Sequence, residues 1–336
     1  MVIRCMSCDL TVCICAYNAE KYIAETLTSL AQQTYKNFKL LIINDCSTDR
    51  TVEVVKSFAD RGWRGFDIVS MEKNRGTAYC RNFALNYTDT DYMMFFDADD
   101  IALPDLIKTL VENMHAASDL IAVGCYCRYM DAAGKKLRGG IFLGPTDKEQ
   151  FEEKARLGKM FFLTLPTLFV RKYALAAGGY RQADWFPAAN GFRYEDLSED
   201  VDLWGRMSDF YSEGKWMKVV PEVLYFYRKI SGSLSSGFKK SRAMGQKIKY
   251  IKSNQLRRRA GLPEEKFDAF WHGQSLFYKL NFERINAGSF LYRSACFSWI
   301  KRQLIRMVLF LLAAALIAPE YPLEKCKSNF RKLKND

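Results

Sequence analysis

Histidine is nearly absent from this sequence, whose 336 residues include only His115 and His272. The ten cysteines do not make up for this lack, because Cys5-Met6-Ser7-Cys8 is not followed by a second Cys-x-x-Cys pair. A structural zinc site needs four such ligands, so we expect none here. The closely spaced pairs, Cys13 with Cys15 and Cys125 with Cys127, are expected to be core residues on one face of a strand.

The sequence also lacks a signal peptide and a long hydrophobic run. Its first apolar stretch, residues 10–16, has neither a basic leader nor a cleavage site, which indicates a reduced, cytoplasmic protein. A later apolar run, Met307 to Ala318, has 12 residues and would span about 18 Å as a helix. A bilayer core is about 30 Å thick. We therefore expect this segment to lie in a membrane surface or to pack on the protein, and not to cross a membrane.

Acidic residues are scarce in the last third of the chain. Residues 1–238 contain 29 Lys and Arg against 31 Asp and Glu, whereas residues 239–336 contain 21 against 7. Nine of these cations fall within residues 239–260, where there is no acid: Lys239, Lys240, Arg242, Lys247, Lys249, Lys252, Arg257, Arg258 and Arg259. Such a stretch favours an anionic partner, either a membrane surface or a nucleic acid.

The first half of the chain alternates between short apolar runs and helical patterns. The apolar runs are residues 11–16, 38–44, 66–71 and 92–96, and another follows at 121–129. Between them, apolar residues recur at helical spacing, as at Ile23, Leu27 and Leu30. This order predicts an α/β fold with a doubly wound, mostly parallel sheet and helices on both faces.

A cluster of carboxylates ends the strand predicted at 92–96. Asp97-Ala98-Asp99-Asp100 places three carboxylates within four positions. Two carboxylates about 4 Å apart repel by roughly 4 kcal/mol at an effective dielectric of about 20, so a cation is expected among them. Ligands bind at the carboxyl ends of parallel strands, and Mg2+ is typically shared between one or two carboxylates and the phosphates of a substrate. The cluster predicts a metal-bridged diphosphate, unless it is only a solvated acidic turn or a helix cap.

Two further segments accompany this cluster. Asp45 follows the apolar run 40–43 and also projects from a strand end, where it either contacts a nucleotide or caps the next helix. The segment from Asn74 to Asn82 is a glycine-containing loop that enters a helix. Within it, Arg81 either meets a phosphate or lies on the surface of the helix.

A carboxylate pair near a tryptophan is the last of these features. Glu199-Asp200 lies close to Trp204, an arrangement that suits a base working beside a sugar ring. Glu195-Asp196 is a rival pair, but it lacks the Leu-Trp-x-Arg sequel that follows Glu199-Asp200. Trp204 could equally be a core residue.

Together these segments resemble glycosyltransferase family 2, whose inverting enzymes have the GT-A fold. The resemblance covers residues 9 to about 236. It rests on seven stretches in the family's order, at residues 11–18, 44–49, 74–82, 97–100, 178–180, 199–200 and 225–228. One departure is Asn44, where the family usually has a second Asp, although the adjacent Asp45 remains.

The resemblance implies a role for each of these sites. The nucleotide-sugar site would consist of Ala16, Tyr17, Asp45, Gly76, Arg81, Asp97 and Ala98. The metal, Mn2+ or Mg2+, would be bound by Asp99 with Asp97. Asp200 would be the catalytic base, and Glu199 and Trp204 would lie on the acceptor side.

The resemblance and the basic region together lead to an expected function. We expect an inverting glycosyltransferase that moves a sugar from a nucleotide-diphosphate sugar, with UDP as the expected nucleotide, to a sugar hydroxyl of a lipid-linked saccharide. Such transfers occur in O-antigen, capsule and exopolysaccharide assembly. A GT-A domain over 1–236 would have a nucleotide-binding half (1–130) and an acceptor-side lobe (131–236). The basic helical region, 237–336, would attach peripherally to the anionic inner face of the cell membrane.

Three alternatives stay open at this point. A polyprenyl-phosphate glycosyltransferase would use a bare lipid phosphate as its acceptor. A nucleic-acid-binding protein would explain the nine cations, but strand-end carboxylates repel phosphate, so no nucleic-acid partner is expected. A non-catalytic scaffold would keep the fold and the basic region without the chemistry, yet the carboxylates expected for the metal and for the base are both present.

Overall fold

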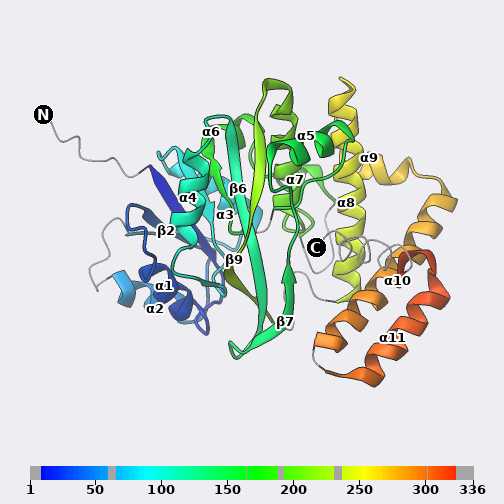
Figure 1. Cartoon of the computed structure of the whole chain (residues 1–336), viewed down its shortest axis with the longest axis horizontal. Helices are drawn as coiled ribbons and strands as arrows, with labels where there is room; N and C mark the ends of the chain where they lie inside the picture. Colours follow the sequence, from blue (N-terminus) through cyan, green and yellow to red (C-terminus); the bar gives the residue numbers. More distant parts are fainter. Residues whose placement is uncertain are drawn as a thin grey trace, which may run out of the picture.

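The computed structural model describes residues 9–59, 66–163, 165–187, 193–230, 237–300 and 302–322. Figure 1 shows a central twisted sheet with helices on its faces and a group of helices from the last third of the chain along one side. The predicted α/β class is confirmed. One edge of the sheet positions the candidate site.

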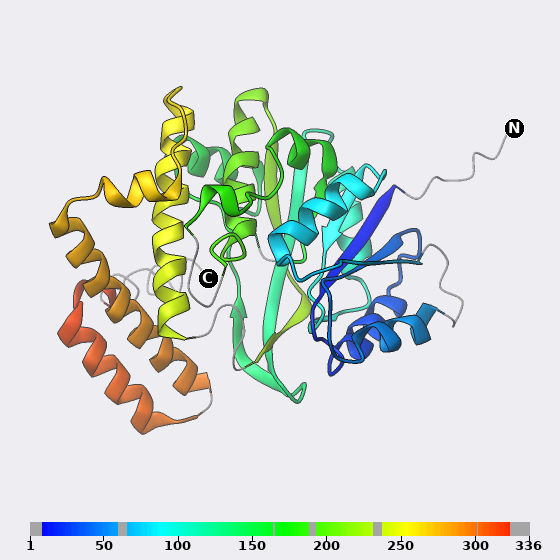
Figure 2. The same cartoon turned by 180° about the vertical axis from the view of Figure 1, so that it is seen from behind.

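One half of the sheet is parallel, as the alternation of apolar runs predicts. Its strands are β1 (Leu10–Ala16), β2 (Lys39–Asn44), β3 (Phe66–Ser70) and β4 (Tyr92–Phe95). They lie in the order β3-β2-β1-β4, and each neighbouring pair is parallel. The helices that connect them are α1 (Ile23–Ala31), α2 (Thr51–Ala59) and α3 (Thr77–Tyr87). In the view from behind, α3 is drawn in cyan and lies across the face of the sheet (Figure 2).

The other half of the sheet is mixed. Its strands are β5 (Ile101–Ala102), β6 (Leu120–Asp131), β7 (Lys136–Ile141), β8 (Leu168–Val170) and β9 (Trp216–Lys229). β8 is antiparallel to both β4 and β6, whereas β6 and β9 form a long parallel pair. Strands from the stretch expected to form an acceptor-side lobe therefore belong to the same sheet as the first half.

Helices of 6 to 10 residues cover this second half. They are α4 (Leu106–His115), α5 (Lys148–Arg156), α6 (Arg171–Ala176) and α7 (Glu199–Met207). The continuous core between the sheet and these helices includes both predicted cysteine pairs: Cys13, Cys125 and Cys127 are buried, and Cys15 is partly buried against the core. Cys5 and Cys8 lie outside the described residues.

The last third of the chain is helical, as expected. It consists of α8 (Phe238–Arg259), α9 (Phe267–His272), α10 (Leu276–Ile300) and α11 (Leu304–Ile317). α8 packs against the rest of the protein through a small aromatic core in which Tyr250, Ile251 and Phe267 are buried beside Phe186. The boundary proposed near residue 236 stays a prediction.

The predicted cationic surface along residues 239–260 requires a correction. At least six of its nine cations have partners inside the protein. Arg242 pairs with Glu283, Arg257 with Glu265, and Arg258 and Arg259 with Asp209, while Lys247 and Lys252 donate to backbone carbonyls. Much of the charge of α8 therefore holds the helix in place and does not form a free surface for an anionic partner.

α10 and α11 form an antiparallel hairpin. The two helices approach so closely at Gly288 that a Cβ atom there would lie 2.6 Å from the Cβ of Ala318. An ion pair between Arg284 and Glu320 also joins them. The apolar run 307–318 therefore packs on α10 along one side, which is one of the two placements that the sequence left open, while other side chains of the run stay exposed. Within the part of the chain that the structure describes, no helix is long and apolar enough to cross a bilayer.

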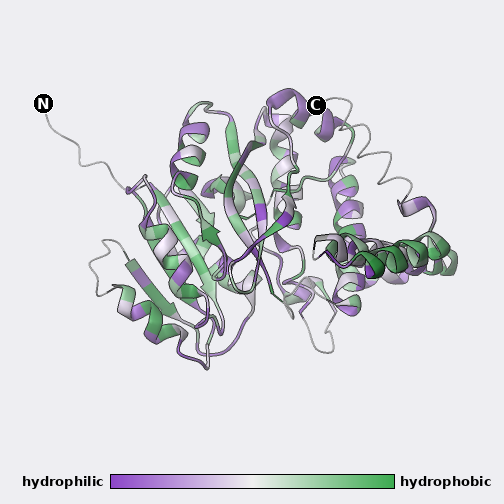
Figure 3. Cartoon of the chain, turned by 60° about the horizontal axis from the view of Figure 1, so that its bottom comes forward, coloured by the Kyte–Doolittle hydropathy of each residue, from purple (hydrophilic) through white to green (hydrophobic). Residues whose placement is uncertain are grey.

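The outer face of this hairpin is apolar. Its exposed large side chains include Leu276, Phe277, Leu280, Leu304, Ile305, Val308, Leu309, Leu312 and Leu316. Figure 3 shows the hairpin at the side of the molecule opposite β2 and α2, whose places Figure 1 labels, with hydrophobic colouring over most of its visible length. Contiguous exposed apolar side chains of this kind often mark an interaction surface.

Candidate active site

The carboxyl ends of three neighbouring parallel strands form the edge at which the predicted residues meet. β1 ends at Ala16, β2 is followed by Asp45, and Asp97 lies two residues beyond the end of β4. Because β1 lies between β2 and β4 and all three are parallel, these residues emerge at the same edge. Ala16 itself is buried, and its carbonyl accepts a hydrogen bond of 2.8 Å from the backbone N–H of Asp45. Tyr17 beside it is 52% exposed.

The three carboxylates that follow β4 face different surroundings. Asp97 is partly exposed, with 38% of its side chain accessible. Asp99 is more deeply placed, and burial, together with the charge of Asp97, raises the pKa of Asp99 to about 7. Asp100 is buried, and its Oδ1 accepts a bond of 2.8 Å from the backbone N–H of Arg228 in β9. Asp97 and Asp99 are therefore the two carboxylates available to a ligand.

Arg228 fixes the turn that carries these carboxylates. Its Nε donates to the carbonyl of Asp99 at 2.7 Å, and its Nη2 donates to Glu25 of α1 at 2.7 Å. The guanidinium also lies over the ring of Tyr22, 4.7 Å from its centroid. The sequence identified Arg228 only as part of a matching stretch, and no signal in it indicated this contact with the acidic turn. The carbonyl of Ala98, another predicted site residue, accepts from Thr26 Oγ1 at 2.9 Å.

A divalent metal fits the donor set at this turn. Carboxylate oxygens are the ligands that Mg2+ and Mn2+ prefer, and two of them lie at the strand end. Among the described residues, no three His, Cys, Asp or Glu side chains are arranged to hold a metal ion by themselves. This agrees with an open site in which the protein supplies one or two carboxylates and a phosphorylated ligand supplies other oxygens.

Arg81 of α3 joins this turn to a second carboxylate group. Its side chain is 4% exposed, so it is not a surface residue of the helix. Nη1 donates to Glu199 Oε1 at 2.5 Å, and Nη2 lies 3.4 Å from Asp97 Oδ1. Burial would lower the pKa of Arg81, but the charges of Glu199 and Asp97 outweigh this effect and raise it. The guanidinium is thus the shared counter-ion of two acids that are far apart in sequence.

Glu199 and Asp200 begin helix α7. Burial raises the pKa of Glu199 to about 7 and also raises the pKa of Asp200, while the charge of Arg81 opposes both shifts. Asp200 Oδ1 accepts a bond of 2.8 Å from the backbone N–H of Val201. A carboxylate whose pKa is raised by burial is suited to accept a proton.

The rival carboxylate, Asp196, supports a loop. Its side chain is 6% exposed, and its Oδ1 accepts a bond of 2.8 Å from the backbone N–H of Ala78 at the start of α3. Arg193, which approaches Asp196 at 4.0 Å, donates to the side chain of Asn74 in the same loop. This arrangement gives Asp196 a structural role and favours Asp200 as the proton acceptor.

Asp45 holds the same loop from its other side. Its Oδ1 accepts from the backbone N–H of Arg75 at 2.6 Å, and its Oδ2 accepts from that of Gly76 at 2.8 Å. Asp45 thus does not cap the helix α2, which was the alternative reading. Gly76 has φ +89°, and a Cβ atom there would lie 2.3 Å from Asp196 Oδ2, so only glycine fits between the two acids.

Trp204 requires a correction. The sequence placed it on the acceptor side, but its side chain has no exposed surface and packs edge-on against Phe169, with 5.6 Å between ring centroids. It is a core residue, because the face of α7 that carries it is turned toward the sheet. Helical spacing shows that Trp204 and Asp200 share a face of α7. It does not show which of the two is buried in the core and which lies at the site.

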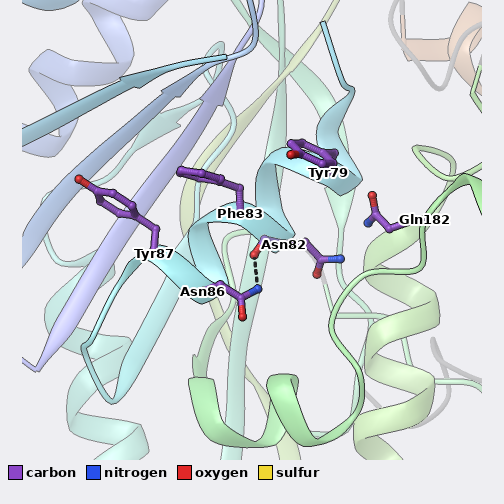
Figure 4. A pocket seen from close by; sticks show the side chains of 6 residues that line it. All are labelled: Tyr79, Asn82, Phe83, Asn86, Tyr87 and Gln182. Atoms are coloured by element: carbon purple, nitrogen blue, oxygen red, sulfur yellow. Dashed lines mark hydrogen bonds between the residues drawn. The ribbon is translucent and has the colours of Figure 1, made fainter. Parts of the chain in front are cut away.

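The outward face of α3 carries a surface hollow that is separate from the carboxylates. It has a volume of about 430 Å3 and is lined by Tyr79, Asn82, Phe83, Asn86, Tyr87 and Gln182. Figure 4 shows Phe83 and Tyr87 side by side along the helix, with Gln182 opposite Tyr79. Asn82 is engaged in two bonds of 2.6 Å with the backbone of Tyr180. None of the predicted site residues lines this hollow.

Comparison with known proteins identifies a family. The model described as Glycosyl transferase family 2 matches residues 11–178, half of the chain. Glycosyltransferase GlyA of Streptococcus pneumoniae is 34% identical over 67% of this chain. The match covers only 31% of the length of GlyA, so the chain corresponds to about a third of that relative.

Two solved structures share the fold. The crystal structure of Staphylococcus aureus TarS residues 1–349 with UDP-GlcNAc matches with a TM-score of 0.51 and 18% identity, over 91% of both chains. The mannosyltransferase PcManGT from Pyrobaculum calidifontis, in complex with GDP-Man and Mn2+, matches with a TM-score of 0.54 and 17% identity, over 92% of this chain and 86% of the other. TarS is also similar in sequence, with 33% identity over 29% of this chain, and is named as a poly(ribitol-phosphate) beta-N-acetylglucosaminyltransferase.

The contact between Gly76 and Asp196 leads to a first prediction. Gly76→Ala should destabilise the protein by about 1 to 3 kcal/mol more than Gly237→Ala, because the new methyl group collides with Asp196. Gly237 is a matched control, since its φ of +91° and ψ of 152° are close to the +89° and 165° of Gly76, but a Cβ there meets nothing within 4 Å. Urea unfolding of both variants measures the difference, and equal losses would show that Asp196 does not confine this loop.

Proposed function

The chain belongs to glycosyl transferase family 2 and has the GT-A fold, and from this premise we propose that it transfers a sugar from a nucleotide-diphosphate sugar to a hydroxyl acceptor. The observation that carries the proposal is the pairing of Arg81 with both Asp97 and Glu199. This pairing brings an acidic strand end and the acids of α7 into one site. The acids at the strand end would serve the leaving group of the donor, and the acids of α7 would serve the hydroxyl of the acceptor. The two groups must therefore lie side by side.

The donor site would lie over the edge formed by β1, β2 and β4. TarS and PcManGT are described with UDP-GlcNAc and GDP-Man, which supports a nucleotide sugar as donor, and we propose UDP as the nucleotide. Ala16, Tyr17, Ala98 and the loop held by Asp45 would line the site. Asp99, with Asp97, would hold Mn2+ or Mg2+, and the metal when bound would neutralise charge on the diphosphate.

The acids of α7 would serve the acceptor. Asp200 would take the proton of the acceptor hydroxyl as the oxygen attacks the anomeric carbon, and the bond from that carbon to the diphosphate would break in the same step. A single displacement inverts the anomeric configuration and needs no covalent sugar intermediate. The raised pKa of Asp200 helps it to accept a proton, and Glu199 would keep Arg81 in place on the acceptor side.

The acceptor would belong to a cell-surface polymer. TarS is named for a transfer to poly(ribitol-phosphate), a polymer with repeating units. We propose a lipid-linked saccharide as the acceptor, because the apolar outer face of the α10–α11 hairpin gives the protein a means to work at a membrane surface. Arg302 and Arg306 are exposed at the start of α11, beside that apolar face, which suits an anionic lipid surface.

Metal-dependent donor binding gives the second prediction. Asp99→Ala should abolish the Mn2+-dependent part of UDP binding, because the more deeply placed of the two available carboxylates is lost. Titration calorimetry with UDP, with and without Mn2+, measures this effect. Asp89→Ala, which removes an exposed surface carboxylate, is the control and should bind as wild type does. Unchanged Mn2+-dependent affinity in Asp99→Ala would refute the metal assignment.

The choice of base gives the third prediction. Asp200→Asn preserves size but removes the basic oxygen, so turnover should fall about 100- to 10,000-fold while UDP binding stays near the wild-type value. Asp196→Asn keeps an oxygen that can accept from Ala78, so its turnover should stay close to wild type. The reverse pattern, an inactive Asp196→Asn and an active Asp200→Asn, would show that the proton acceptor is the other acid.

Membrane attachment gives the fourth prediction. The chain of 336 residues should sediment with vesicles that contain phosphatidylglycerol. Replacing Leu309, Leu312 and Leu316 together with Glu should abolish sedimentation, because these exposed residues share one face of α11. Leu262→Glu, at an equally exposed site outside the hairpin, should have no effect. A wild-type protein that ignores the vesicles would end the membrane proposal.

A further inference from the structure

A buried lysine reaches from the C-terminal helices toward the carboxylates of the site. Lys247 lies in the middle of α8 and is 1% exposed, although it belongs to the most basic stretch of the sequence. Burying an ammonium group without partners is costly, so the position of Lys247 requires an explanation. Its contacts supply one.

The ammonium group donates hydrogen bonds to backbone carbonyls four and five residues before the start of α7 at Glu199. Nζ donates to the carbonyl of Tyr194 at 2.8 Å and to that of Glu195 at 3.0 Å. It also lies over the ring of Phe186, 4.4 Å from the ring centroid. The carbonyl of Tyr194 additionally accepts from the backbone N–H of Leu197. Lys247 therefore organises the turn that runs from Tyr194 to the start of α7.

The negative charges of four carboxylates act on the ammonium group of Lys247. Burial lowers the pKa of Lys247 to about 8, while the charges of Asp202, Glu199, Asp196 and Asp200 oppose this shift. The charge of Lys247 in turn favours the ionised forms of Glu199, Asp196 and Asp202. Three of the acids have other cationic neighbours: Arg81 at Glu199, Arg193 at Asp196, and Arg181 with Arg206 at Asp202.

We propose that Lys247 is a positioning residue for the sugar-transfer site. By holding the carbonyls of Tyr194 and Glu195, it places Asp196 under the Gly76 loop and presents Glu199 and Asp200 at the start of α7. Its charge also favours the ionised forms of Asp196 and Glu199. The effect of Lys247 on turnover rests on the proposed function, but its effect on the turn at Tyr194 does not. The two effects are tested separately.

Hydrogen–deuterium exchange on the full chain tests the structural consequence without a substrate. In Lys247→Met, which has similar volume but no donor, the amides of Leu197 and Ala78 should exchange about tenfold faster or more, because their bonds to Tyr194 and Asp196 lose support. Amides in β1 and β2 should keep wild-type rates. The control is Lys249→Met, an exposed lysine two residues along α8, which should change neither set.

Unchanged protection at both Leu197 and Ala78 in Lys247→Met would overturn the proposal. Equal loss of protection throughout the sheet would also overturn it, because Lys247 would then serve only global stability. If Lys247→Met does not fold, Lys247→Gln, which keeps one donor, takes its place. Failure of both variants to fold would likewise reject a local role.

The pH dependence of turnover tests the catalytic consequence. Loss of the Lys247 charge raises the pKa values of the facing acids, so the acid limb of the kcat/KM profile should move to higher pH in Lys247→Met and Lys247→Gln. A merely structural role would lower the profile without moving the limb, and that result would overturn the catalytic half of the proposal. If the wild type transfers no sugar from UDP-sugars, the proposed function fails, while the exchange experiment still decides the role of Lys247.

Discussion

The organisation of the site depends on one buried guanidinium. Arg81 pairs with Asp97, which follows β4, and with Glu199, which begins α7, so a single side chain connects two elements more than a hundred residues apart in sequence. A buried charge that loses one of its partners typically costs about 3 to 5 kcal/mol. The acids on both sides are therefore fixed relative to each other by the need of Arg81 for counter-ions.

Other buried charges farther from the site are paired in the same way. Asp202 of α7 pairs with Arg181 and Arg206, Arg181 pairs with Glu264, and Glu264 also pairs with Arg258 of α8 at 2.5 Å. The positive charge of α8 is thus matched by acids from the rest of the chain, among them Asp209. A stretch whose composition resembles a free basic surface is largely part of the internal structure.

Much of the fold could be predicted from the sequence, because β1 to β4 and their helices are local patterns with clear periodicity. β8 could not, since three residues carry no pattern, and the partners of β9 are set by long-range pairing with β6. The position of Asp45 and Asp97 at one edge of the sheet could be predicted from its parallel topology. The bonds of Asp196, Lys247 and Arg228 did not, because each spans distant segments and involves backbone groups that a sequence does not distinguish.

The seam between α10 and α11 reverses the usual distribution of side-chain sizes. Gly288, Ala295, Ala314 and Ala318 are buried in this part of the chain, whereas most of its leucines are exposed. Small residues allow two backbones to come close, as they do where helices pair among lipids, but they remove little apolar area from water. Most of the apolar surface of the hairpin can therefore be buried only by the medium around it. The stability of the hairpin should depend on that medium as much as on contacts within the chain.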